Sequence, residues 1–222
     1  MRLYFDPIST TSRPITFLLH DQGIAFEEAH VNLFLGEQYG ADYLALNPIG
    51  QVPLLDDDGF RLTESCAILK YIAQKCGLSV YPTEPKAQAR VDEMLSWFST
   101  NFIAYHGFFG AYQKMFAPVF KVSPATVEEL SRVSENGSKR YLTFLDQKLA
   151  QHAFVAGDEL SIADYSGISF VTVAEYTDFD FSPYPNVAAW IERMKARPGY
   201  QAAYAGFRGF LMAARAEPRQ SA

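Results

Sequence analysis

The sequence predicts an α/β domain followed by an all-helical domain, and three observations support this division. Residues 1–78 alternate between short strand-like runs and amphipathic helical runs. Residues 79–85 carry two prolines and no apolar periodicity, which is typical of a linker. In residues 86–222 the apolar side chains recur at helical spacing, with prolines and glycines between the helical stretches. We therefore expect domains 1–78 and 86–222, joined by the linker 79–85.

The first domain is expected to have the element order βαβαββα, which is that of a thioredoxin-like domain. The helical runs are 12–22 and 63–76, and the strand-like runs are 3–5, 26–31, 52–55 and 60–62. A loop or short helix separates the second and third strands. Pro14 is tolerated in the first turn of its helix, and Gly23 and Gly77 end the two helices. An acidic turn joins the last two strands as a hairpin.

Composition excludes several classes of function. The chain of 222 residues has 49% apolar and 20% charged residues, which is ordinary for a globular protein with a real core. Its formal net charge of −6 disfavours a nucleic-acid partner, because phosphate binding needs clustered lysine and arginine side chains. No apolar run approaches the roughly 20 residues that cross a bilayer, and no leader-like run precedes the first strand. We therefore expect no membrane partner and a cytoplasmic location.

The cysteines and histidines give no sign of a metal site. Cys66 and Cys76 lie in one helical run, which disfavours a structural disulfide and fits a reducing cytosol. The four histidines are dispersed without the spacing that metal ligands have. No glycine motif for binding phosphate is present either. We expect no metal cofactor.

Four hydroxyl residues, 9–12, stand between the first strand and the first helix. In redox proteins of the thioredoxin-like fold a C-x-x-C motif occupies this place, where the helix N-terminus stabilises a thiolate. This chain has no sulfur there, so its hydroxyls can instead donate a hydrogen bond to a thiolate that a ligand brings. The other interpretation is a plain N-cap, which Ser12 alone would satisfy. We expect Ser12 as the cap and Ser9 as the donor, while Thr10, Thr11 and Ser12 remain rivals to Ser9.

Val52-Pro53 opens the third strand beside this loop. A cis bond is expected here, because cis peptide bonds are largely confined to proline in tight turns. Such a turn leaves the backbone of Val52 free to pair with an extended peptide as an added strand. The alternative is a trans proline at the first residue of a strand.

Thr63-Glu64-Ser65 begins the last helix of the first domain. Hydroxyls and unpaired N–H groups at a helix start can bind a carboxylate, and Glu64 can receive an ammonium group. By itself this motif is typical of any helix start. Together with the hydroxyl loop and Val52-Pro53, it supplies the parts needed to hold the thiol, the peptide backbone and the paired charges of glutathione.

Several longer segments resemble those of the cytosolic glutathione transferases and imply the two-domain fold of that family. These segments are 44–55, 62–72, 160–165, 185–190 and 197–198. The run 4–9 is most similar to theta- and delta-type members, in which a serine activates the sulfur, so the resemblance implies that Ser9 is catalytic. It also implies a homodimer, and contacts to glutathione from Gln38, Gln51, Val52, Pro53, Glu64 and Ser65. Gln38 stands where theta-type members often have a histidine.

The resemblance implies a transferase whose bound glutathione, as thiolate, attacks a hydrophobic electrophile. An aromatic wall with one polar group is expected to line the electrophile's pocket, on the first long helix of the second domain. Its residues are Tyr105, His106, Phe108, Phe109 and Tyr112. The alternative is core packing, since aromatic residues at helical spacing are usually buried. Two other functions stay open: a non-catalytic binding or scaffold protein of the same fold, and a glutathione-dependent lyase or dehalogenase.

Overall fold

The computed structural model describes residues 1–216, apart from the side chains of residues 117–120. The chain divides into two compact units. The first contains Met1–Cys76 together with residues from Arg197 onward, and the second is Gly77–Ala196. The expected α/β part lies in the first unit, and the expected all-helical part lies in the second only as far as Ala196. No helix within residues 1–216 is long and apolar enough to cross a membrane.

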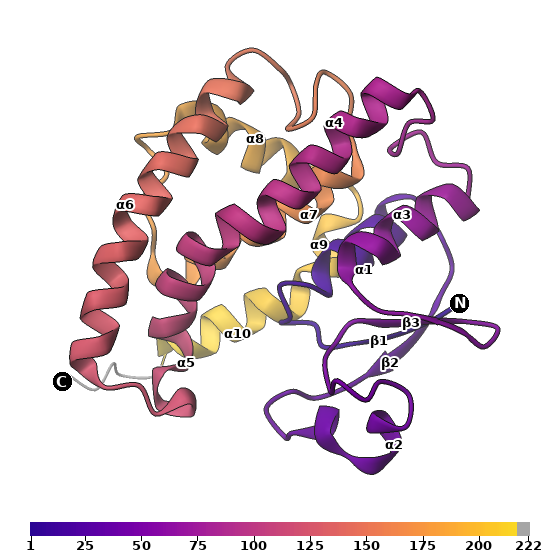
Figure 1. Ribbon diagram of the computed structural model, residues 1–222, viewed down its shortest axis with the longest axis horizontal. Helices are drawn as coiled ribbons and strands as arrows, with labels where there is room; N and C mark the ends of the chain where they lie inside the picture. The colour runs from indigo at the N-terminus through magenta and orange to yellow at the C-terminus, as the bar shows by residue number, and fades with distance from the viewer. Residues whose placement is uncertain (217–222) are drawn as a thin grey trace. The chain divides into compact units, whose positions relative to one another are not determined.

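A four-stranded mixed sheet forms the centre of the first unit (Figure 1). Its strands, in the order β2-β1-β3-β4, are Glu27–His30, Arg2–Phe5, Leu54–Asp57 and Phe60–Leu62. Strand β1 is parallel to β2 and antiparallel to β3, and β3 is antiparallel to β4. The register places Leu3 opposite Leu55, and both side chains are fully buried. The sheet order confirms the predicted thioredoxin-like arrangement.

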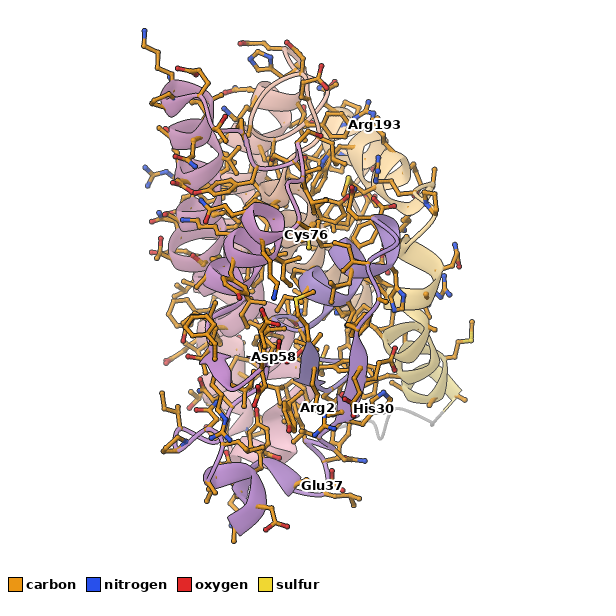
Figure 2. The ribbon with its side chains drawn as sticks, turned by 90° about the vertical axis from the view of Figure 1, so that its right-hand side faces the viewer. Arg2, His30, Glu37, Asp58, Cys76 and Arg193 are labelled. Atoms are coloured by element: carbon orange, nitrogen blue, oxygen red, sulfur yellow. The ribbon has the colours of Figure 1, made fainter. Side chains whose placement is uncertain are left out.

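The hairpin between β3 and β4 is tighter than the sequence predicts. Asp57 pairs with Phe60, which leaves a turn of only Asp58 and Gly59 between them. Both turn residues have positive φ, 53° and 88°, as a type I′ turn requires. The Asp56 carboxylate accepts a hydrogen bond from Gly59 N at 2.9 Å. Figure 2 labels Asp58 at this turn, where the short connection fixes the end of β3.

Helices cover both faces of the sheet (Figure 1). Helices α1, Arg13–Asp21, and α3, Ser65–Lys75, lie on one face, and the short α2, Ala41–Leu44, lies on the other. Residues Arg13 to Leu19 of α1 are all buried, so this helix forms much of the core. The remaining helices of the unit are the 3-10 turn η1, Glu37–Tyr39, and the C-terminal helices α9, Tyr200–Ala203, and α10, Ala205–Ala216.

The segment that follows Arg197 packs on α1 and completes the first unit. The carboxylate of Asp21, at the end of α1, lies 2.7 Å from both Nε and Nη2 of Arg197. Gly199 N donates to the same carboxylate at 3.2 Å, and a Cβ at Gly199 would lie only 2.3 Å from Asp21 N. Phe17 of α1 makes an edge-to-face contact with Tyr204. These contacts place the C-terminal segment in the first unit, whereas the expected boundaries place it in the helical domain.

The second unit is built of helices. They are α4 Pro85–Ser96, the π-helical stretches η2 Trp97–Phe102 and η3 Ala104–Ala111, α5 Tyr112–Phe120, α6 Pro124–Leu149, α7 Ile162–Thr172, the 3-10 helix η4 Val173–Thr177 and α8 Pro185–Lys195. Every residue of α7 is buried, which makes it the central helix. At its start, Asp164 accepts hydrogen bonds from Ser161 N and Oγ, from Val155 N and from Trp190 Nε1. One buried carboxylate thus joins three segments of this unit.

Candidate active site

The loop between β1 and α1 presents the four hydroxyl residues. Ser9 O accepts hydrogen bonds from Ser12 N and Arg13 N, at 3.2 and 3.1 Å, and Ser9 Oγ accepts from Ser12 N at 3.2 Å. This is the bonding of an N-cap. Ser12 has helical φ and ψ, and its buried Oγ has no hydrogen-bond partner among the described residues. Ser12 therefore occupies the N-cap position of α1, as predicted, but its side chain makes no capping hydrogen bond, and the Ser9 side chain caps the turn before it.

The four hydroxyls differ in their exposure. Thr10 and Ser12 are buried, and the Arg13 guanidinium donates a hydrogen bond to Thr10 Oγ1 at 3.4 Å. Ser9 and Thr11 are half-buried, and their hydroxyl oxygens are 3.1 Å apart. Of the loop's hydroxyls, Ser9 and Thr11 are therefore the pair that a ligand can reach.

A buried cation lies behind this loop. Arg13, in the first turn of α1, is fully buried, and its guanidinium lies 3.7 Å from the ring centroid of Phe207 and 4.9 Å from that of Tyr204. Cation–π contacts of this kind stabilise a guanidinium that water does not solvate. Its charge adds to the positive potential at the N-terminus of α1. The loop around Ser9 is therefore favourable for an anion.

The turn that carries Val52-Pro53 is held firmly. The peptide bond is cis, as the sequence predicts, and Thr11 Oγ1 donates to Val52 O at 3.2 Å. The preceding carbonyl, Gln51 O, accepts hydrogen bonds from Tyr43 OH at 2.6 Å and Asn47 Nδ2 at 2.8 Å. Burial raises the pKa of Tyr43, so its hydroxyl stays a proton donor. These bonds fix the backbone at Val52 next to the hydroxyl loop.

Glu64 and Ser65 lie at the start of α3. Glu64 has φ 66° and ψ 111°, a conformation that a non-glycine residue adopts only where its surroundings impose it. Its side chain is exposed, whereas Ser65 is buried at the first turn of α3. Both residues line a cavity of about 70 Å³. The complete lining is Thr11, Asn47, Ile49, Gln51, Val52, Pro53, Thr63, Glu64 and Ser65.

Gln38 and Ser9 lie outside the lining of this cavity but are connected to it. Ser9 is joined to it through Thr11. Gln38, in η1, is buried, and its Oε1 has no hydrogen-bond partner among the described residues. A Cβ at Gly50 would lie 3.1 Å from Gln38 O, so η1 packs against the loop that leads to Val52. The site residues predicted in the first unit therefore belong to adjoining loops.

A second buried carboxylate joins two of these loops. Asp6 Oδ1 accepts a hydrogen bond from Ile8 N, and Asp6 Oδ2 accepts one from Leu33 N, both at 2.9 Å. The backbone oxygen of Asp6 also accepts Ser9 N at 3.0 Å. Asp6 thus holds the loop of Ser9 against the loop that leads to Gln38.

Comparison with known proteins agrees with this geometry. Residues 3–74 match the family described as Glutathione S-transferase, N-terminal domain, and residues 111–198 match Glutathione S-transferase, C-terminal domain. A solved delta-class glutathione transferase of Nilaparvata lugens is 30% identical over 97% of this chain and 98% of its own, with a TM-score of 0.83. The chain belongs to the glutathione transferase family.

Two other solved transferases show the same similarity. Glutathione transferase F7 from Populus trichocarpa is 28% identical over 93% of this chain and 98% of its own, with a TM-score of 0.82. Glutathione transferase E6 from Drosophila melanogaster is 26% identical over 96% of each chain, also with a TM-score of 0.82. The predicted theta- or delta-like type of this transferase is consistent with the delta-class match.

Sequence reasoning missed three residues that position this site of the transferase: Asp6, Tyr43 and Asn47. A local signal existed for two of them, because Asp6 and Asn47 each accept a hydrogen bond from the backbone N–H two residues later. Such turns are typical of Asp and Asn in loops. Tyr43 gives no such signal, since its bond to Gln51 O depends on the path of the loop between them.

The predicted acceptor residues of the transferase lie in and beside the π-helical stretch η3 of the second unit. Phe108 is exposed, and Tyr105, Phe109 and Tyr112 are half-buried. The ring centroids of Phe108 and Tyr112 are 5.4 Å apart, and those of Tyr105 and Phe109 are 5.7 Å apart. These four rings give the helical unit an accessible aromatic surface.

His106 differs from its neighbours because it lies in the core of the helical unit. Its Nε2 donates to Val171 O at 3.1 Å, so Nδ1 is the nitrogen that accepts from Ser138 Oγ at 3.3 Å. Burial lowers the pKa of His106 to about 4, although the bond to Val171 opposes this, and the ring is neutral at pH 7. Both ring nitrogens have internal partners. For His106 the alternative of core packing therefore holds, and it does not offer its polar atoms to a ligand.

Proposed function

We propose that this transferase activates the thiol of bound glutathione through Ser9. The observation that carries the proposal is the half-buried Ser9 hydroxyl at the start of α1, linked through Thr11 to the backbone of Val52. A free thiol has a pKa of about 8.5, so little of it is thiolate at neutral pH. Three groups favour the thiolate: a hydrogen bond from Ser9, the N-terminus of α1 and the Arg13 cation. Together they can lower the pKa of the glutathione thiol by about one to two units.

The other groups of glutathione match the rest of this site. The backbone of Val52, beside Pro53, can pair with the cysteinyl residue as an added strand. The start of α3 at Ser65 can bind the γ-glutamyl carboxylate, and the exposed Glu64 carboxylate can pair with the ammonium group. Gln51 lines the same cavity, and the unpartnered Oε1 of Gln38 fits a contact near the glycine end.

The thiolate attacks an electrophilic carbon and forms a carbon–sulfur bond. In a displacement, the leaving group departs with the electrons of the bond that breaks; in an addition, the adjacent carbon takes up a proton. The aromatic residues Tyr105, Phe108, Phe109 and Tyr112 contact the hydrophobic electrophile in this proposal, and the buried His106 supports them by fixing the helix. Besides activating sulfur, the protein contributes mainly the proximity of the two substrates.

The active form is proposed to be a cytoplasmic homodimer without a nucleic-acid or membrane partner. Members of this family typically dimerise, and neither Cys66 nor Cys76 forms a disulfide in the part of the chain that the structure describes, which fits a reducing compartment. Figure 2 labels Cys76, which is exposed just after α3. Light scattering of the purified protein should give twice the mass of one chain; the mass of a single chain would contradict the dimer.

The test compares wild type with Ser9→Ala and with Ser12→Ala, a matched loss of a neighbouring hydroxyl that has no hydrogen-bond partner within the described residues. At one hundred times its dissociation constant, glutathione should stabilise each folded protein by about 2.7 kcal/mol and raise its Tm. Wild type and Ser12→Ala should conjugate a chloro-nitroaromatic substrate, while Ser9→Ala should bind glutathione and lose about 10- to 100-fold in kcat. Equal turnover in Ser9→Ala would remove Ser9 from this role, and no Tm shift in any protein would remove glutathione from this site.

A further inference from the structure

A short chain of hydrogen-bonding groups connects the backbone of Val52 with the Ser9 hydroxyl. Thr11 Oγ1 lies 3.2 Å from Val52 O and 3.1 Å from Ser9 Oγ. Ser9 Oγ also accepts a hydrogen bond from Ser12 N at 3.2 Å. Val52 O can only accept, whereas each hydroxyl can both donate and accept. Two protons, one on Thr11 and one on Ser9, therefore decide which group donates and which accepts in each of these hydrogen bonds.

As long as the hydrogen bond between Ser9 and Thr11 is kept, those two protons have two arrangements. In the first, Thr11 donates to Val52 O and Ser9 donates to Thr11 Oγ1, so both protons are used within the protein. In the second, Thr11 donates to Ser9 Oγ, and the Ser9 proton is free to point at a ligand. The second arrangement leaves Val52 O without the hydrogen bond from Thr11. It is favourable only when another donor reaches that carbonyl, because an unpaired acceptor in a partly buried site costs free energy.

We propose that Thr11 is a positioning residue that couples the docking of glutathione on Val52 to the direction of the Ser9 proton. This inference depends on the proposed function, in which a peptide N–H of glutathione pairs with the backbone of Val52. That N–H supplies the donor that Val52 O needs, and the Thr11 hydroxyl is then released to turn toward Ser9. The Ser9 proton becomes available for the sulfur when the tripeptide is in place.

The same arrangement makes Ser9 a stronger donor. With Thr11 turned toward it, Ser9 Oγ accepts two hydrogen bonds, one from Thr11 and one from Ser12 N. Hydrogen bonds in such a chain polarise one another, so an oxygen that accepts two bonds donates its own proton more strongly. Thr11 thus acts on the thiolate through Ser9 and without touching the sulfur.

The test uses Thr11→Val, which keeps the shape of the side chain and removes its hydroxyl, and Thr11→Ser, which restores the hydroxyl. The pKa of the bound glutathione thiol is measured by ultraviolet titration of its thiolate absorbance. In Thr11→Val we expect this pKa to rise by about half a unit to one unit. The kcat measured at a pH below that pKa should fall about 3- to 10-fold. Thr11→Ser should restore wild-type values, and the dissociation constant of glutathione should change less than about 3-fold.

A double-mutant cycle separates the coupling role from a direct contact with sulfur. If Thr11 acts through Ser9, then Thr11→Val added to Ser9→Ala leaves the thiol pKa where Ser9→Ala alone has placed it. An equal rise in both backgrounds would show that Thr11 itself donates to the sulfur and would overturn the proposal. An unchanged thiol pKa in Thr11→Val with a wild-type Tm would overturn it too. Failure of the proposed function is distinguishable, because wild type would then show no binding of glutathione, or Ser9→Ala alone would leave the thiol pKa unchanged.

Discussion

At the scale of single residues, the protonation of His106 is linked to folding. The pKa of His106 is lowered to about 4 in the folded protein, whereas an unfolded histidine has a pKa of about 6.5. Between these values the unfolded chain binds a proton that the folded chain does not. The free energy of unfolding therefore falls as the pH decreases through this window. Above about pH 6.5 the neutral ring keeps its full contribution to stability.

The measurement compares wild type with His106→Gln, whose amide can still form hydrogen bonds but does not titrate near neutral pH. From pH 7 to pH 5 we expect wild type to lose about 2 kcal/mol of stability more than the variant, judged by urea unfolding at each pH. Parallel pH profiles would mean that His106 is not the buried neutral group described above.

At the scale of elements, the Asp6 carboxylate determines how two loops meet. An amide in its place has only one acceptor oxygen, so either Ile8 N or Leu33 N loses its partner in Asp6→Asn. We expect a loss of about 1–3 kcal/mol in the free energy of unfolding. The KM for glutathione should rise about 3- to 10-fold, because these loops lead to Ser9 and Gln38.

The matched control is Asp42→Asn, which removes the same charge from an exposed position of α2. Its stability should stay within about 0.5 kcal/mol of wild type. Urea unfolding and steady-state kinetics of the two variants are the readouts. Wild-type kinetics in Asp6→Asn would show that the loops keep their places without this carboxylate.

The order of the elements in the first unit was predictable because each has a local signature. These signatures each span only a few residues; examples are Pro14 in the first turn of a helix and the alternating apolar runs of the strands. The predicted turn of the β3–β4 hairpin was too long. Whether Asp57 pairs with Phe60 depends on both strands together, so neither strand's own residues indicate where the pairing ends. The bond from Thr11 to Val52 O joins residues 41 apart, so no local pattern signals it.

The aromatic stripe of the second unit shows a different limit. Spacings of three and four residues predict one continuous face only for a helix with about 3.6 residues per turn. The stretches Trp97–Phe102 and Ala104–Ala111 are π-helical, with hydrogen bonds five residues apart, and this rotates the face. Phe98 and Phe102 are fully buried, and His106 joins them in the core. Sequence spacing did not indicate that change of helix type.

At the scale of the whole molecule, the bond between Asp21 and Arg197 joins the two ends of the sequence into one unit. In Arg197→Met the Asp21 carboxylate, which is fully buried, loses its charged partner. We expect a loss of about 3 kcal/mol in the free energy of unfolding. In the control Arg90→Met, an exposed ion pair with Glu93 is lost, and the expected cost is under about 1 kcal/mol.

Urea unfolding followed by circular dichroism compares these two arginine variants with wild type. Limited proteolysis is a second readout, because a segment released from α1 should be cut faster, at sites beyond position 197, in the Arg197→Met variant. Equal losses in both variants, with equal rates of cleavage, would show that the bond contributes no more than a surface ion pair.

The first unit consists of residues from both ends of the chain, and this also affects how the protein folds during its synthesis. On the ribosome, the helical unit Gly77–Ala196 emerges ahead of the segment from Arg197 onward, which the first unit still lacks at that point. Domains usually fold in the order of synthesis, but here the middle of the nascent chain is the first part that can fold to completion. Phe207 can pack against Arg13 only after the whole helical unit has been synthesised. The loop of Ser9 therefore gains its aromatic backing after the helical unit, and a chain without Phe207 lacks this support behind the proposed thiol site.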